Sequence, residues 1–216
     1  MFLEHGFEGL AIDLNPEACA ANRAENLEYV TDGRLRVACA SFFAVDLPAQ
    51  ADLFFAAMVL EHLQPSEVEA FLAAARDRLA PGGRIAVLVP AGMQYWGIED
   101  EVAGHLRRYS YADLRAMARR AGLRVLHLRG LTFPLSNWLL PLSNRLVRRA
   151  EDHRRQLHPA ERTRLSGMRE VPLKTVLPST ARLVINSFTL WPFDLAQRLF
   201  RNSSRSLILY CEMSVY

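Results

Sequence analysis

The segment Ala51–Leu63, ADLFFAAMVLEHL, constrains the fold more than any other part of the chain. Every residue from Leu53 to Leu60 is apolar, which is typical of a strand buried in a parallel sheet with helices on both faces. The run stops at Glu61 and His62. Ligands bind at the carboxyl edge of open α/β sheets, so these two titratable residues belong either to a binding site or to a solvated turn.

Composition limits the possible functions of the chain. Its 216 residues, half of them apolar, suffice for one domain over 1–216, and the net charge of +3 does not indicate a nucleic-acid partner. The cysteines at 19, 39 and 211 form no CxxC pair, so they favour a reducing cytoplasm over a disulfide framework and indicate no zinc site. The N-terminus is not a signal peptide, and no apolar run reaches the roughly 18 residues of a membrane span. We therefore expect a cytoplasmic protein without a metal centre.

Strands and helices are expected to alternate. Four further strands are predicted at Gly9–Leu14, Leu35–Cys39, Ile85–Val89 and Arg124–Arg129. Predicted helices start at Asn15-Pro16 and run to about Glu28, start at a capping box from Ser66 to Glu69, and run from Ser110 to Gly122. This alternation predicts an α/β fold with a doubly wound, mostly parallel sheet.

The pattern changes after residue 130. Residues 131–203 predict a helical insert, with helices near Ser136–Arg149 and Thr180–Phe200, before a strand over Ser206–Met213 that alternates like an edge strand. The first of these helices carries Trp138 beside a leucine stripe and ends in arginines. Residues 131–149 therefore either pack on the sheet as a substrate lid or make peripheral contact with a membrane.

Two strand ends carry candidate ligand-binding residues. Asp13 lies between a strand and a helix, where an acid either binds ribose hydroxyls or caps the helix. Ser41 and Phe42 follow the next strand, where an aromatic ring either flanks a flat ligand or belongs to the core.

Taken together, these segments resemble class I S-adenosylmethionine-dependent methyltransferases. The resemblance is carried by AIDLNPEA, VLEHL, LAPGGRIAVLVP and GHLRRYSYADLRAMARRAGL in that order, and it resumes at SLILYCEM. It covers roughly residues 7–130 and the last strand. It implies a Rossmann-like fold with an antiparallel last strand and S-adenosylmethionine as cofactor.

The resemblance also implies roles for individual residues. It places the ribose at Asp13 and Leu14. The adenine lies beside Ser41 and Phe42, although the family's usual acid is replaced by Ser41. The methionine moiety and methyl group lie at Met58, Val59, Glu61 and His62, and the substrate faces His105, Arg107 and Tyr109. His62 and His105 are then candidate catalytic bases, and each is otherwise a structural histidine.

The family's first strand and Gly-rich turn are not found in the sequence, so the chain is expected to begin partway through the fold. The missing strand would lie between Gly9–Leu14 and Leu53–Leu60, and we expect residues 1–216 alone to be poorly stable and to bind the donor weakly or not at all. The leading hypothesis is methyl transfer to a small-molecule or lipid-intermediate acceptor. The alternatives are a non-catalytic, truncated remnant acting as a binding partner, and another doubly wound enzyme that uses a nucleotide-sugar or a dinucleotide.

Overall fold

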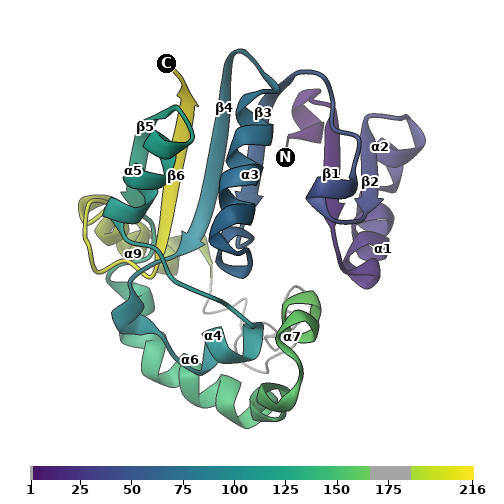
Figure 1. Cartoon of the computed structure of the whole chain (residues 1–216). Helices are drawn as coiled ribbons and strands as arrows, with labels where there is room; N and C mark the ends of the chain where they lie inside the picture. Colours follow the sequence, from purple (N-terminus) through teal and green to yellow (C-terminus); the bar gives the residue numbers. More distant parts are fainter. Residues whose placement is uncertain (1, 166–185) are drawn as a thin grey trace.

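A computed structural model describes residues 2–165 and 186–216. Strands and helices alternate through the first 130 residues, and helices predominate in the described residues between the last two strands (Figure 1). The strands are β1 (Gly9–Asp13), β2 (Leu35–Cys39), β3 (Ala51–Ala57), β4 (Leu79–Pro90), β5 (Leu123–Gly130) and β6 (Ile208–Val215). The α-helices are α1 (Pro16–Glu25), α2 (Leu27–Thr31), α3 (Pro65–Arg76), α4 (Ile98–Ala103), α5 (Tyr111–Arg120), α6 (Leu135–Glu151), α7 (Pro159–Leu165) and α9 (Ser187–Leu199). The α/β class predicted from the sequence is confirmed.

The larger sheet has four strands in the order β3-β4-β6-β5. β3 and β4 are parallel, and β6 is antiparallel to both of its neighbours, β4 and β5, as predicted. The expectation that this last strand lies at the edge is wrong, because β6 lies between β4 and β5. Its alternating pattern reflects polar groups such as Glu212 that find partners inside the sheet, where Tyr210 donates a hydrogen bond to it at 2.9 Å.

The strands β1 and β2 form a separate parallel pair. Within the described residues, β1 pairs with β2 and β3 pairs with β4, so the sheet is interrupted between β1 and β3. Figure 1 shows β1 and β3 facing each other across the interruption. The interruption lies between the strand that ends at Asp13 and the strand that begins at Ala51.

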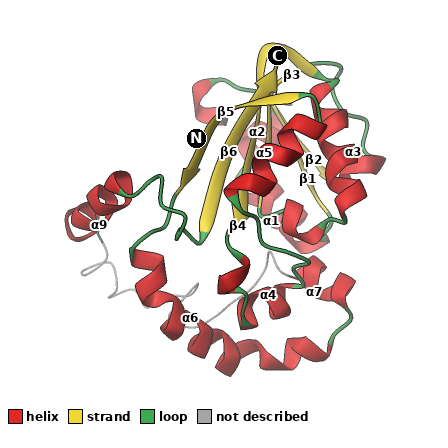
Figure 2. Ribbon diagram, turned by 60° about the vertical axis from the view of Figure 1, so that its left-hand side comes forward, coloured by secondary structure: helices red, strands yellow, loops and turns green. Residues whose placement is uncertain are grey.

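The main core lies between the larger sheet and the helices α3 and α5 (Figure 2). Leu72 on α3, Leu114 on α5 and Ile85 on β4 are fully buried there. The other side of β3 is less covered than its sequence predicts, since Leu53 is 39% exposed and Phe55 is 53% exposed. The apolar run is therefore better buried on one face, where Ala56 is 5% exposed, than on the face that carries Leu53 and Phe55.

The chain leaves β3 earlier than predicted. The strand ends at Ala57, Met58 has a positive φ of 54°, and a 3₁₀ turn, η3, covers Leu60–His62. A non-glycine residue in the left-handed region is uncommon, and here it reverses the chain at the end of the strand. The strand predicted over Leu53–Leu60 is thus too long by three residues at its carboxyl end.

Several helix boundaries also differ from the predictions. Helix α3 begins at Pro65, because the N–H of Gln64 is held at 2.7 Å by the Glu67 carboxylate, so the predicted box from Ser66 to Glu69 is wrong. The first helix ends at Glu25, where Asn26 separates it from α2. The Ser110–Asp113 capping box of α5 is confirmed.

The helices of residues 131–165 lie beyond the carboxyl ends of β3 and β4 (Figures 1 and 2). Helix α6 packs against α4 through Val147, Ile98 and Val102, and the Asn15 side chain donates to the Arg164 carbonyl of α7 at 3.0 Å. The helix predicted at Thr180–Phe200 is described from Ser187 to Leu199, and its first predicted residues lie outside the described part. None of the described helices is long and apolar enough to span a bilayer.

Candidate active site

A large open groove of about 2600 Å³ runs between β1 and β3 and reaches the residues beyond their carboxyl ends. Nine of the eleven predicted site residues line it: Asp13, Leu14, Ser41, Phe42, Met58, Val59, Glu61, His62 and His105. Residues from α6 and α7 close its lower side, among them Leu139, Leu142 and Arg164. The groove therefore joins the predicted cofactor-binding and catalytic residues in one space.

Asp13 lies at the end of β1 with an exposed side chain. Its Oδ1 atom accepts a hydrogen bond from the Asn15 backbone N–H at 2.7 Å. The N-terminus of α1 is capped by Asn15, whose side-chain oxygen accepts from the N–H groups of Glu17 and Ala18 at 2.8 and 3.4 Å. Because Asn15 performs the capping, Asp13 is held in place by the turn and remains directed toward the groove.

Ser41 and Phe42 border the groove from the end of β2. The Ser41 hydroxyl accepts a hydrogen bond from the Phe43 N–H at 3.3 Å and caps a short 3₁₀ turn. Phe42 packs against Phe71 of α3, with ring centroids 4.7 Å apart. Phe42 is thus a half-buried extension of the core that also lines the groove.

Met58 and Val59 form the bend after β3 and are 37% and 40% exposed. The N–H of Met58 donates to the Leu88 carbonyl at 2.9 Å, which anchors the bend to β4. Leu14, which directly follows β1, is 58% exposed. These three apolar side chains give the groove an apolar lining at the strand ends.

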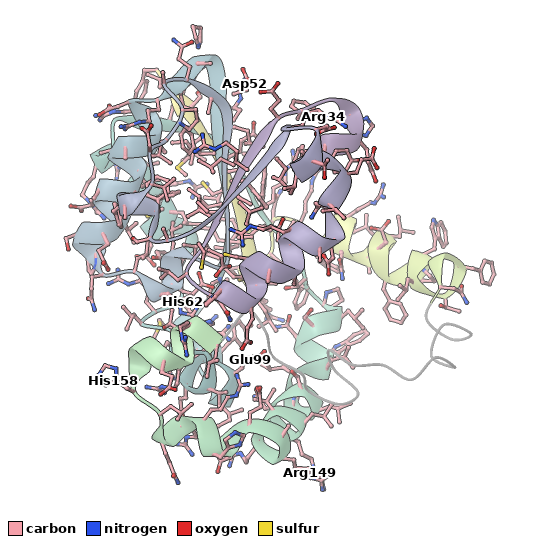
Figure 3. All side chains as sticks on the ribbon, turned by 90° about the vertical axis from the view of Figure 1, so that its right-hand side faces the viewer. Arg34, Asp52, His62, Glu99, Arg149 and His158 are labelled. Atoms are coloured by element: carbon pink, nitrogen blue, oxygen red, sulfur yellow. The ribbon has the colours of Figure 1, made fainter. Side chains whose placement is uncertain are left out.

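Glu61, His62 and His105 form a compact cluster beneath the bend. One potential ligand atom from each lies within 4.8 Å of the others, and His105 Nε2 is 3.9 Å from Glu61 Oε1. The two imidazole rings meet edge to face with centroids 4.8 Å apart. Figure 3 shows His62 where the upper, sheet-containing part meets the lower helices.

A backbone hydrogen bond joins η3, which carries Glu61 and His62, to the loop that carries His105. The Leu106 N–H donates to the Glu61 carbonyl at 2.7 Å, which fixes the loop carrying His105 against η3. The Nδ1 atom of His105 is hydrogen-bonded to Asp100 Oδ1 at 2.8 Å. Asp100 is fully buried and also accepts from Arg108 Nε at 2.8 Å and from the Gly97 N–H at 2.9 Å.

Burial dominates the electrostatics of the cluster. It raises the pKa of Glu61 to about 7 and lowers the pKa of His62 to about 4, since in both cases the charged form loses its hydration. Burial also acts on Asp100, but the hydrogen bonds from His105 and Arg108 outweigh it and lower the pKa of Asp100. The result is an ionised carboxylate behind His105 and a neutral His62 at pH 7.

A comparison with protein families matches residues 1–128 to a family described as a methyltransferase domain. The match covers more than half of the 216 residues. The chain belongs to this methyltransferase family. A comparison with curated protein sequences found no match.

Solved methyltransferase structures share the fold. The glycopeptide N-methyltransferase MtfA complexed with S-adenosyl-L-methionine matches all of this chain and 75% of its own, with a TM-score of 0.52 and 12% identity. The O-methyltransferase NcsB1 from neocarzinostatin biosynthesis is 25% identical over 56% of this chain, with a TM-score of 0.45. The pyocyanin biosynthetic protein PhzM is 15% identical over 56% of this chain, with a TM-score of 0.44. The matched part is 38% of the length of NcsB1 and of PhzM.

Two residues predicted to face the substrate lie outside the groove lining. Tyr109 is 3% exposed, and its hydroxyl donates to the Leu60 carbonyl at 2.8 Å, so it joins the loop to η3. Burial raises its pKa to about 12. Arg107 is half-buried, and its Nε atom has no hydrogen-bond partner among the described residues. Tyr109 therefore has a structural contact where a substrate contact was predicted.

Sequence reasoning missed Asp100 and Arg108, which support His105. Asp100 lies in the first turn of α4, where an acid is ordinary, and five residues separate it from His105. The available signal was the Gly97-to-Asp100 spacing at a helix start, which predicts only a cap. The second contact of this carboxylate, to His105, depends on the turn at Gly104, with φ of 75°.

Proposed function

We propose that this chain carries out methyl transfer from S-adenosylmethionine to a small-molecule acceptor. The observation that carries the proposal is the groove at the carboxyl ends of β1 and β3, which brings Asp13 and the His105 cluster into one space in a methyltransferase-family domain. MtfA, which has the same fold, is complexed with this donor. Family membership disfavours the dinucleotide or nucleotide-sugar alternative.

The residues along the groove fit the parts of the donor. The exposed Asp13 carboxylate suits two ribose hydroxyls, and the half-buried Phe42 offers a flat apolar surface beside Ser41 for the adenine. Met58, Val59 and Leu14 give an apolar border for the methionine chain. When bound, the donor supplies a methyl group already activated by its sulfonium.

The protein must then align an acceptor and take up its proton. His105 is the better candidate for the base, because Asp100 orients its ring and balances the positive charge that it gains. His62 has a pKa near 4, so it is neutral and only weakly basic at pH 7. Glu61 lies beside the His105 ring, with its Oε1 atom 3.9 Å from His105 Nε2.

The helices of residues 131–165 are proposed to form the acceptor side of the site. Leu139, Leu140, Leu142 and Leu146 of α6 line the groove, which favours an acceptor with an apolar body, including a lipid intermediate. Trp138 is 70% exposed in the first turn of the same helix, and Arg148 and Arg149 lie in its last turn. We extend the proposal to peripheral membrane contact through residues 131–149, and to a cytoplasmic location in keeping with three free cysteines.

One observation favours a second function. The facing edges of β1 and β3 are not paired with each other, which leaves backbone groups available for another strand. A chain of this form suits a non-catalytic role as a binding partner that keeps the methyltransferase fold. Formation of S-adenosylhomocysteine from the donor with a panel of hydroxyl and amine acceptors distinguishes the two functions.

Donor binding tests the proposed function directly. Asp13→Ala is expected to weaken S-adenosylmethionine binding by about 1.5–3 kcal/mol, roughly 10- to 100-fold, because the ribose loses a charged hydrogen-bond acceptor. Isothermal titration calorimetry measures this against Asp194→Ala, which removes an exposed carboxylate on α9. Equal dissociation constants for the two variants would remove Asp13 from the site, and no binding by the unmodified chain would favour the non-catalytic alternative.

A further inference from the structure

Glu61 is an unusual buried acid. Its side chain is 0% exposed, and neither carboxylate oxygen has a hydrogen-bond partner among the described residues. An ionised carboxylate in such a place ordinarily requires a hydrogen bond, a close cation or a metal ion. Its nearest cationic group is His105 Nε2 at 3.9 Å, beyond hydrogen-bond distance. The oxygens therefore remain available to a ligand that enters from the groove.

His62 and His105 each bring one potential ligand nitrogen close to Glu61. The Nδ1 atom of His62 is buried and has no hydrogen-bond partner within the described part of the chain. Nδ1 of His105 is engaged by Asp100, which leaves Nε2 directed toward Glu61. Three potential ligand atoms thus lie within 4.8 Å of one another, and all three residues line the groove.

The surroundings of His105 match those of a metal-binding histidine. Such a histidine commonly donates its second ring N–H to a carboxylate, which fixes the ring and strengthens the ligand nitrogen. Asp100 occupies this position at 2.8 Å, and it is fixed by Arg108 and Gly97. A histidine that acts only as a base also has such a partner. The carboxylate oxygens of Glu61 and the Nδ1 atom of His62, which have no partner in the described chain, therefore favour a metal.

We propose that Glu61, His62 and His105 bind a divalent transition-metal ion, with Zn²⁺ the best fit to two imidazoles and one carboxylate. Metal–ligand bonds of about 2.0–2.2 Å place tetrahedral ligand atoms roughly 3.3–3.5 Å apart, so the cluster contracts slightly on binding. Three protein ligands leave one position open toward the groove. This arrangement is typical of catalytic zinc sites, whereas structural sites have four protein ligands.

The inference rests on the proposed function for the role of the ion. An acceptor hydroxyl at the open position loses its proton more readily, because the ion stabilises the oxygen anion. The O–H bond breaks, the electron pair stays on oxygen, and the proton passes to solvent. The metal then takes over the deprotonation assigned above to His105, and the acceptor class is narrowed to hydroxyl compounds.

Metal uptake tests the site without any activity assay. The chain, stripped with a chelator and free of any affinity tag, is titrated with Zn²⁺ in competition with a chromophoric chelator. We expect one ion per chain, and a loss of affinity of at least tenfold in Glu61→Gln and in His105→Ala. His127→Ala is the matched control, since it removes an exposed histidine on β5 and is expected to bind as the unmodified chain does. Uptake that is the same in all four proteins overturns the proposal.

Cobalt substitution gives a measurement that does not depend on a variant folding. Co²⁺ bound by the unmodified chain is expected to show the visible absorption of a tetrahedral or five-coordinate ion, and Zn²⁺ is expected to displace it. Absence of this spectrum at saturating Co²⁺ overturns the site. Donor binding by the metal-free chain, measured by calorimetry, tests the proposed function separately. A failure of the metal site therefore leaves the proposed function standing, and the reverse also holds.

Discussion

The three cysteines differ sharply in access to solvent. Cys39, at the end of β2, is exposed, whereas Cys19 and Cys211 are 1% and 0% exposed. Burial raises the pKa of the Cys211 thiol to about 12, and burial followed by the neighbouring Cys39 raises that of Cys19. The thiolate is the reactive form of cysteine. Burial and the raised pKa therefore each protect Cys19 and Cys211 from thiol reagents.

We expect one thiol per chain to react rapidly with Ellman's reagent near pH 8 in the native protein, and all three in denaturant. Cys39→Ser is expected to abolish the rapid phase, while Cys211→Ser leaves it unchanged. A rapid phase that survives Cys39→Ser would show that the β1–β2 unit opens and exposes Cys19.

Single residues also show where sequence reasoning reached its limit. Asp13 and His62 were predicted from their positions after strands and His105 from the family resemblance, and all three line the groove. The pairing of Asp100 with His105 was not predicted, because it requires the chain to fold back across a short helix and a left-handed glycine. Tyr109 was predicted from the resemblance to face the substrate. Its burial was missed, because burial cannot be read from residue type alone.

Helices α6 and α9 carry the largest exposed aromatic residues of the described chain. Trp138 and Trp191 are 70% and 62% exposed, and Phe188 is 89% exposed. Exposed aromatics on helices that also carry arginines favour the surface of an anionic bilayer.

We expect the protein to sediment with vesicles containing anionic lipid, and less at high salt, because the arginines contribute through screened charges. Trp138→Glu and Trp191→Glu are each expected to reduce vesicle affinity roughly tenfold or more, since each removes about 1.5–3 kcal/mol of apolar burial. Leu27→Glu on α2, which replaces a residue 63% exposed on another part of the fold, is the control. If the unmodified chain stays in the supernatant, membrane contact is excluded.

The existence and order of the strands were easier to predict from the sequence than their boundaries. All six strands were predicted, because each is a short apolar run between helix caps or turns. The position of β6 inside the sheet was not, because its pairing partners, β4 and β5, are far away in the sequence. The end of β3 was also missed, since Met58, Val59 and Leu60 continue the apolar run after the backbone has turned at Met58.

The described chain consists of two units that differ in how much apolar surface they bury. The main core cluster is built from α3, α5 and the four-stranded sheet, and its buried members all lie between Ala56 and Met213. The unit of β1, α1, α2 and β2 contributes only Cys19 and Leu35 to the buried apolar residues described. No strand pairing in the described chain joins it to β3. Since buried apolar area is the main source of stability, this unit is expected to open separately and at lower free energy.

Hydrogen exchange with mass spectrometry tests this division. Without donor, amides of β1 and β2 are expected to exchange through openings that cost less than the unfolding of β4 and β6, which should approach the global free energy of about 5–15 kcal/mol. The donor, as proposed, contacts Asp13 on one unit and Met58 on the other, so it binds only when the two are docked. At about 100 times its dissociation constant, it should therefore raise the opening free energy of β1 and β2 by up to about 2.7 kcal/mol. The Asp13→Ala variant should show a smaller increase at the same donor concentration. Equal protection of the two units without donor would contradict the division, because it would mean that the four-stranded sheet and the β1–β2 pair unfold as one.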